Sequence, residues 1–170
     1  SNNARSVIFV AFSGEEIGGF GSRYLSKKLV ADNIIAMINI EMIGKASVYG
    51  TGTVWMTGSE RSNLAELFNK TLVKKQMEIY PDPYPKLALF YRSDNISFAK
   101  LGVPAHTFSS SPMENNNDYH QSTDTVSTLN FPAMYSVIKT LAIASQQLID
   151  AKITPDRIAK ITATKKGKIF

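Results

Sequence analysis

The sequence predicts an α/β sandwich with a largely parallel sheet. Short, continuous apolar runs rich in β-branched and aromatic residues are typical of strands that helices cover on both faces. Segments with apolar residues at helical spacing separate these runs. The 170 residues are about one domain's worth of chain, with no repeat and no internal linker, so we expect a single core.

The first half of the chain alternates between strand and helix patterns. Ser6–Phe12 is a continuous apolar run and predicts a buried strand. Gly21–Val30 predicts a short helix, and Ile34–Ile40 predicts a second buried strand. The glycines at 50 and 52 separate two further β-rich pieces, so residues 48–56 predict a hairpin.

The second half begins with an amphipathic helix over Glu60–Lys75. The proline-rich stretch Tyr80–Pro85 predicts a loop, because proline disfavours both regular elements. Asn95–Leu101 predicts a short helix and Val103–Phe108 a third buried strand. After a polar loop over 109–119, Asn130 is a good cap for a long final helix.

The two ends of the chain carry no strong functional pattern. We interpret residues 1–4 as an artificial remnant or a cut loop, and 151–170 as a basic C-terminal tail. Part of the net charge of +5 lies in this tail, at Lys160, Lys165, Lys166 and Lys168. Because aromatic residues do not interleave with these lysines, a solvated terminus is favoured over a nucleic-acid surface. No apolar stretch approaches the roughly 20 residues of a membrane span.

Acidic and imidazole groups follow the ends of the predicted strands. Glu15 and Glu16 come after the first strand, Glu41 ends the second, and His120 lies in the loop after the third. In α/β sheets the loops at the carboxyl ends of strands gather at one edge, so we expect these groups to converge there. Carboxylates and imidazole without sulfur suit catalytic Zn²⁺, and the chain has no cysteine.

Each candidate also has a structural interpretation. Two adjacent glutamates are usually a solvated loop, and a lone histidine is usually a hydrogen-bonded surface group. His106 lies within an apolar run and is favoured as a core histidine. Asp94 is equally well explained as a helix cap. A phosphate loop is excluded because no lysine follows the glycines, and the G-x-S-x-G elbow of serine hydrolases is absent.

Four ordered motifs then resemble a known family. "SVIFVAFSGEEIGGFGSRYL", "INIEMIG", "YRSDNISFAKLGVPA" and "DYHQSTDT" are similar to segments of the zinc aminopeptidases that include bacterial leucyl aminopeptidase. Glutaminyl cyclase and glutamate carboxypeptidase belong to the same superfamily. The resemblance runs from about residue 5 to 150 and implies a three-layer α/β/α sandwich with a mixed, mainly parallel sheet.

The resemblance implies a role for seven residues. Glu15 resembles the general base, while Glu16 and His120 resemble ligands of one zinc ion. Glu41 stands where the family usually has an aspartate that binds the other zinc. The remaining three resemble residues that surround the metal ligands: Asp94, Asp118 and Tyr119.

Two elements of the family site have no counterpart in this sequence, namely a second histidine ligand and the aspartate that bridges the zinc ions. We therefore interpret the chain as the C-terminal portion of a catalytic domain, truncated at its N-terminal side. The parent protein is expected to be a two-zinc aminopeptidase acting on peptide substrates, and its relatives are often exported. The chain alone is expected to be inactive, to bind zinc weakly or not at all, and to self-associate. A glutaminyl cyclase and a module that has lost its metals are the alternatives.

Overall fold

Four strands form one mixed sheet at the centre of the computed structural model, which describes residues 3–114 and 116–162. The strands are β1 (Met37–Ile40), β2 (Val54–Met56), β3 (Ile79–Pro81) and β4 (Ala105–Ser109), in the spatial order β1-β4-β2-β3. β1 runs parallel to β4 and β2 parallel to β3, whereas β2 and β4 are antiparallel. This arrangement confirms the mixed, mainly parallel sheet.

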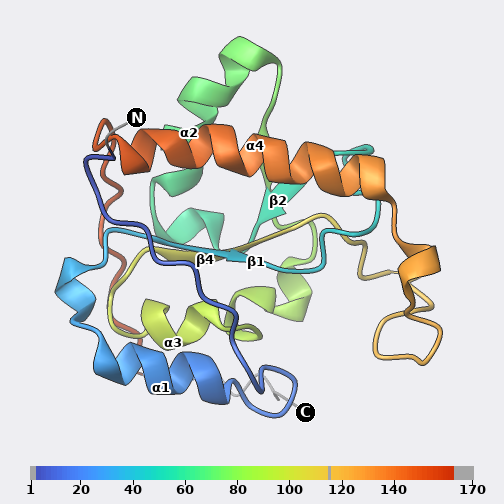
Figure 1. Ribbon diagram of the computed structural model, residues 1–170, viewed down its shortest axis with the longest axis horizontal. Helices are drawn as coiled ribbons and strands as arrows, with labels where there is room; N and C mark the ends of the chain where they lie inside the picture. The colour runs from blue at the N-terminus through green and yellow to red at the C-terminus, as the bar shows by residue number, and fades with distance from the viewer. Residues whose placement is uncertain (1–2, 115, 163–170) are drawn as a thin grey trace.

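Helices cover both faces of the sheet (Figure 1). One layer holds α2 (Leu64–Leu72) and α4 (Phe131–Ile149), and the other holds α1 (Phe20–Lys28) and α3 (Asn95–Ala99). Short 3₁₀ turns connect these elements, at 31–33, 59–61, 73–75, 85–87, 89–91 and 126–128. Each layer has its own apolar cluster, so the predicted three-layer sandwich is confirmed.

The apolar stripes of the helices explain this layering. On α2, Leu64, Phe68 and Leu72 recur every fourth residue and are fully buried. They pack with Val54 and Phe108 of the sheet and with the inner face of α4. The Asn130 side chain accepts a hydrogen bond from the Ala133 amide at 3.0 Å, which confirms its predicted capping role.

The predicted strand over Ser6–Phe12 is wrong. This segment has no helix or strand hydrogen-bond pattern, and the Ile8 and Phe9 side chains are 66% and 94% exposed. A strand needs a neighbour to pair its backbone groups, and no described strand pairs with residues 6–12. The segment instead runs along the outside of the protein, held at its start by Arg5, which donates to the carbonyls of Leu148 and Ile153.

Two turn predictions also differ from the structure. The hairpin predicted over residues 48–56 does not form. Val48 and Tyr49 do not pair with β2, whose partners are β3 and β4. Gly50 and Gly52 adopt positive φ angles and close a tight turn instead. The predicted loop at Tyr80–Pro85 begins inside β3, where Pro81 is tolerated because β3 is an edge strand.

The outer edge of β3 is blocked by side chains. The Asn69 amide both donates to the Ile79 carbonyl and accepts from its amide, at 2.9 and 2.8 Å. Pro81 has no N–H, and its carbonyl accepts from the Tyr49 hydroxyl. These groups protect β3 against pairing with another strand. At the opposite edge of the sheet, no strand in the described ranges pairs with the outer side of β1.

Residues 151–162 are mostly exposed, as expected for a solvated tail, but two of their side chains fix this stretch to the protein. This stretch has no regular structure, yet Ile158 is only 5% exposed and belongs to the apolar cluster beneath α3. Arg157 donates to the carbonyls of Ala31 and Ile34, at 3.1 and 2.8 Å. Lys165, Lys166 and Lys168 lie outside the described residues. No helix in the described part of the chain is long and apolar enough to span a membrane.

The Asn130 cap has a measurable effect on stability. We expect Asn130→Ala to lower the free energy of unfolding by about 1 kcal/mol, because an amide in the first turn of α4 loses its acceptor. Asn130→Asp keeps an acceptor and should stay within about 0.5 kcal/mol of the original chain. Urea denaturation followed by circular dichroism measures both, and equal stabilities of the two variants would contradict the capping role.

Candidate active site

A pocket of about 420 Å³ lies where β1 ends and α1 begins. Six of the seven predicted site residues line it, whereas Asp118 does not. The six are Glu15, Glu16, Glu41, Asp94, Tyr119 and His120. The convergence expected from the strand ends is therefore present, although Glu15 and Glu16 reach the pocket from a coil segment instead of a strand.

A tight turn places the two adjacent glutamates. The Gly19 amide donates to the carbonyls of Gly14 and Glu15, at 2.8 and 3.0 Å. Gly14 and Gly19 both have positive φ, which favours glycine at these positions. The turn leads directly into α1. Burial raises the pKa of Glu15, and the neighbouring charges of Glu16 and Asp94 raise it further.

The backbone after Glu41 is held in an unusual conformation. Met42 has a φ of 49°, in the left-handed region that non-glycine residues rarely adopt. Its carbonyl accepts from the amides of Ser110 and Ser111 and from the Ser109 hydroxyl. These three donors tie the end of β1 to the end of β4, and so hold Glu41 at the pocket.

A series of hydrogen-bonded side chains, buried except for the half-buried Asn39, orients the Glu41 carboxylate. Ser93 donates to Glu41 Oε2 in a short hydrogen bond and accepts from the Asn39 amide at 2.8 Å. The same Asn39 nitrogen donates to Thr107 Oγ1 at 2.9 Å, and Thr107 donates to Asn95 Oδ1 at 3.1 Å. The direction of each hydrogen bond in this series is therefore defined, and the series connects Glu41 to buried side chains at the centre of the sheet.

Glu41 has the largest change in acidity at the site. Burial raises its pKa to about 7, the Ser93 hydrogen bond opposes this rise, and the charges of Glu15, Asp94 and Glu16 add to it. A carboxyl group with this pKa is partly protonated at neutral pH. In the metal-free chain, protonation relieves part of the repulsion between the clustered carboxylates.

His120 contacts Glu16 directly. Its Nε2 lies 3.1 Å from Glu16 Oε2, and the Tyr119 ring stacks on the imidazole with ring centroids 4.0 Å apart. His120 also has a positive φ of 57°. Two of the predicted zinc ligands are therefore adjacent, and both are partly exposed to solvent.

Asp118 anchors the loop that carries His120. Its carboxylate pairs with Lys45 Nζ at 2.6 Å, and Lys45 also donates to the Thr128 carbonyl at 2.9 Å. The hydrogen bond from Lys45 lowers the pKa of Asp118. Asp118 thus faces away from the pocket, and it ties the two ends of the loop to the turn after β1.

Asp94 lies at the start of α3 but does not cap it. No capping hydrogen bond forms from its side chain, and its Oδ1 is buried without a hydrogen-bond partner among the described residues. Burial raises the pKa of this carboxyl group. The Ser22 hydroxyl opposes this rise in pKa, and because Asp94 lines the pocket, its carboxyl group adds to the acidic character there.

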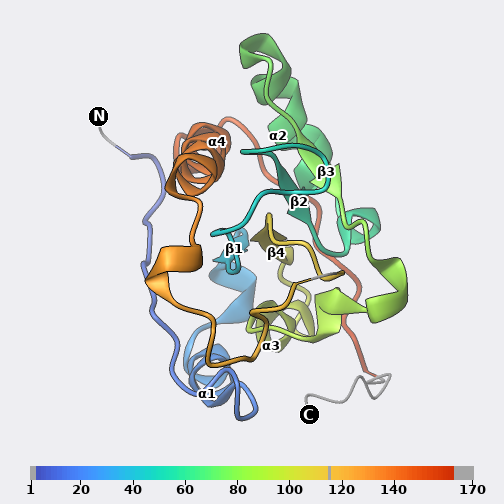
Figure 2. The same cartoon turned by 90° about the vertical axis from the view of Figure 1, so that its right-hand side faces the viewer.

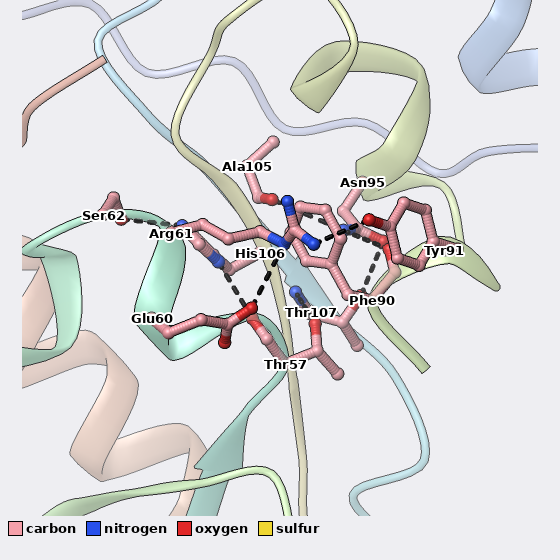
Figure 3. Close-up of polar contacts among 10 residues, drawn as sticks. All are labelled: Thr57, Glu60, Arg61, Ser62, Phe90, Tyr91, Asn95, Ala105, His106 and Thr107. Atoms are coloured by element: carbon pink, nitrogen blue, oxygen red, sulfur yellow. Dashed lines mark hydrogen bonds and ion pairs between the residues drawn. The ribbon is translucent and has the colours of Figure 1, made fainter. Parts of the chain in front are cut away.

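His106 belongs to the core, as the sequence indicated. The ring is fully buried, with Nδ1 2.9 Å from the Thr57 carbonyl and Nε2 2.8 Å from Ser62 Oγ (Figure 3). A carbonyl cannot donate, so Nδ1 carries the proton and Nε2 accepts from Ser62. Burial lowers the pKa of His106, and both nitrogens are used in holding β4 against the start of α2.

The donors of this chain do not complete a zinc site by themselves. Carboxylates and imidazole are ligands that zinc uses, and the buried Asp94 Oδ1 lacks a partner. However, no three His, Asp or Glu side chains in the described ranges come together closely enough to hold a metal ion. Glu16 and His120 supply two adjacent donors, one fewer than catalytic zinc usually has from protein.

Some lining residues were missed by the sequence analysis. Arg92 lines the pocket, and Asn39 both lines it and orients Ser93. Arg92 directly precedes Ser93 and Asp94 in the "RSDN" motif, so its position in the sequence was the available signal. Asn39 gave a weaker signal, as a polar residue within an otherwise apolar strand.

The fold and the pocket together define the class of protein as an α/β sandwich with a carboxylate-rich pocket beside the end of an edge strand. The sequence profile of peptidase family M28 matches residues 1–144, so the chain belongs to peptidase family M28. No curated protein matches the sequence significantly.

Several solved structures have the same fold. An aminopeptidase from Aneurinibacillus sp. strain AM-1 is 22% identical, with a TM-score of 0.59 over 90% of this chain and 35% of its own. The Legionella pneumophila LapA aminopeptidase is 20% identical, with a TM-score of 0.68 over 88% of this chain and 41% of its own. A zinc aminopeptidase from Bacillus subtilis, BSAP, is 17% identical, with a TM-score of 0.68 over 90% and 38%. The chain therefore spans well under half the length of these structures.

The raised pKa of Glu41 predicts how stability depends on pH. Its pKa is about 7 in the folded chain and near 4.5 when unfolded, so the folded state binds more protons between these values. The stabilisation is therefore full below pH 4.5 and is lost as the pH rises through 7, by about 3 kcal/mol for the metal-free chain. Glu41→Gln cannot titrate and should flatten this slope. Urea denaturation between pH 4.5 and 8 measures it, and an unchanged slope in the variant would contradict the assignment.

Proposed function

We propose that this chain forms part of the catalytic domain of a metal-dependent aminopeptidase, with Glu15 as the general base. The observation that carries the proposal is the geometry of the pocket. Glu15 is half-buried between its neighbour Glu16, which contacts His120, and the buried Glu41. Membership of peptidase family M28 supports a peptide as the substrate.

Glu15 has the environment of a general base. Its raised pKa brings the carboxylate closer to the operating pH, which favours transfer of a proton in both directions. In the proposed reaction Glu15 takes a proton from the water that attacks the peptide carbonyl, and then returns it to the leaving amine. Glu16 cannot serve equally well, because it is exposed and its Oε2 contacts His120.

We further propose that Glu16, His120 and Glu41 hold zinc together with donors from residues outside this chain. When bound, the metal would acidify the attacking water and polarise the scissile carbonyl. The Met42 turn and the Ser93 hydrogen bond hold Glu41 in place for such a role. Because these donors do not complete a site, we expect the chain alone to be inactive and to bind zinc weakly or not at all.

A larger domain would also explain the exposed apolar surface. Ile8 and Phe9 are exposed side by side, and β1 is an edge strand with Ile40 48% exposed. The solved relatives extend over more than twice the length that this chain covers. We propose that further chain covers this surface in the parent protein, and that the isolated chain covers it by self-association.

Replacement of Glu15 tests the proposed chemistry in the complete, zinc-loaded protein. We expect Glu15→Gln to lower kcat on aminoacyl anilides by at least about 100-fold, because the amide cannot accept the proton. Zinc content, measured by atomic absorption, should not change, since Glu15 is not a proposed ligand.

Glu66→Gln is the matched control, because Glu66 is an exposed residue of α2 that pairs with Lys70 on the same helix. This control should keep its turnover. Near-normal turnover of Glu15→Gln would contradict the assignment of the base. Conversion of N-terminal glutaminyl peptides without hydrolysis of aminoacyl anilides would replace the aminopeptidase with a cyclase.

The exposed apolar segment predicts that the 170-residue chain self-associates. Analytical ultracentrifugation at micromolar concentration should show species larger than a monomer, and Phe9→Ser should shift the distribution toward monomer. Val73→Ser is the control, because Val73 is also exposed but lies beyond α2, away from residues 6–12. A monomer at all concentrations, or an equal effect of both substitutions, would contradict the proposal.

A further inference from the structure

We propose that Arg92 binds a carboxylate of the peptide, so that the pocket selects peptides with a carboxylate close to the scissile bond. This inference rests on the proposed function and adds a substrate class to it. The carboxylate has two possible sources, which are the C-terminus of a dipeptide and an acidic side chain at the second residue.

Backbone hydrogen bonds hold Arg92 at the edge of the pocket. The Arg92 amide donates to the Leu89 carbonyl at 3.0 Å, at the end of the 3₁₀ turn over 89–91. The next two residues are Ser93, which holds Glu41, and Asp94, which begins α3. Arg92 therefore extends from a short connection that is held at both ends, and the residue lines the pocket.

The guanidinium of Arg92 lacks a partner within the described ranges. Three other arginines donate to carbonyl, hydroxyl or carboxylate oxygens, namely Arg5, Arg61 and Arg157. The structure shows no hydrogen bond or ion pair from the Arg92 side chain to another described residue, and its charge acts on Glu15 and Tyr119 only at longer range. Its fork of N–H donors is therefore available for an anion.

The charges of the pocket match a zwitterionic ligand. Four carboxylates line it, from Glu15, Glu16, Glu41 and Asp94, and they suit the ammonium group of a peptide. Arg92 supplies the opposite charge, which partly opposes the rise in pKa that burial causes in Glu15 and in Tyr119. A guanidinium binds a carboxylate through two parallel hydrogen bonds, a geometry that a neutral amide cannot reproduce.

The size of the pocket also favours a short peptide. A volume of about 420 Å³ lies in the range of small-molecule sites. With the ammonium among the carboxylates and Arg92 in the same pocket, the carboxylate of a bound peptide lies only a residue or two from the amine. Long neutral peptides would leave Arg92 without a counter-ion, so we expect them to bind more weakly.

Direct binding tests the inference without catalysis. Isothermal titration of the metal-free 170-residue chain compares Leu-Gly with Leu-Gly-amide, and Leu-Asp-amide with Leu-Asn-amide. The peptide with the carboxylate should bind at least about tenfold more tightly in one pair, and that pair identifies the source of the carboxylate. Arg92→Gln should bring the ratio close to one, and Arg92→Lys should keep part of it.

Arg23→Gln is the matched control, because Arg23 is an exposed residue of α1 that does not line the pocket, and the change in charge is the same. It should leave the ratio unchanged. Circular dichroism of each variant shows whether it folds. A ratio near one for the original chain, or a ratio that Arg92→Gln does not change, would overturn the inference.

Hydrolysis by the complete, zinc-loaded protein separates this inference from the proposed function. The same peptide pairs should differ in KM more than in kcat, because Arg92 binds the ground state and the transition state alike. Hydrolysis of all four peptides at equal kcat/KM would overturn the role of Arg92 and leave the aminopeptidase proposal standing. Arg92-dependent binding without any hydrolysis would overturn the aminopeptidase proposal and leave the role of Arg92 standing.

Discussion

The repulsion between four carboxylates in one pocket is the constraint on which the site depends. Glu15, Glu16, Glu41 and Asp94 lie around the same volume, and burial strengthens their mutual repulsion. Three features of the metal-free chain lower this repulsion. The pKa of Glu41 is raised to about 7, Glu16 contacts His120, and the positively charged Arg92 lines the same pocket. One carboxylate oxygen still lacks a hydrogen bond, because Asp94 Oδ1 has no partner among the described residues. A positive charge in this pocket would lower the repulsion, although the donors of this chain do not complete a metal site among the described residues.

The fold keeps the carboxylates together against this repulsion through buried polar bonds. Pairing of β1 with β4 sets Asn39 beside Thr107, and the hydrogen bonds from there reach Ser93 and Glu41. A buried amide or hydroxyl that lost its partner would cost about 1–3 kcal/mol, so each member holds the next in place. The orientation of the Glu41 carboxylate is therefore fixed by hydrogen bonds that begin between β1 and β4 in the sheet.

The sequence predicted the features that depend on local pattern. The stripe on α2, the Asn130 cap, the buried His106 and the strand-end position of Glu41 all follow from residue spacing. Features that depend on a distant partner were missed. The apolar run at 6–12 has strand composition, but a strand also needs a neighbour, and no described strand pairs with it. Likewise, Arg92 and Asn39 belong to the site because of neighbours more than 50 residues away in sequence. Asn39, for example, donates a hydrogen bond to Ser93. The burial of Ile158 could not be predicted from local pattern, because its contacts lie under α3 while Arg157 and Lys160 beside it are basic.

The exposed apolar segment over residues 6–12 lies next to the pocket that holds the incomplete set of metal donors. Val10, Ala11 and Phe12, which end the exposed apolar run, line the same pocket as Glu15 and Glu41. Ile40, at the end of the edge strand β1, lines this pocket as well and is 48% exposed. The outer edge of β3 differs, because Asn69 and Tyr49 occupy its backbone groups. The exposed apolar surface and the incomplete set of metal donors therefore border each other.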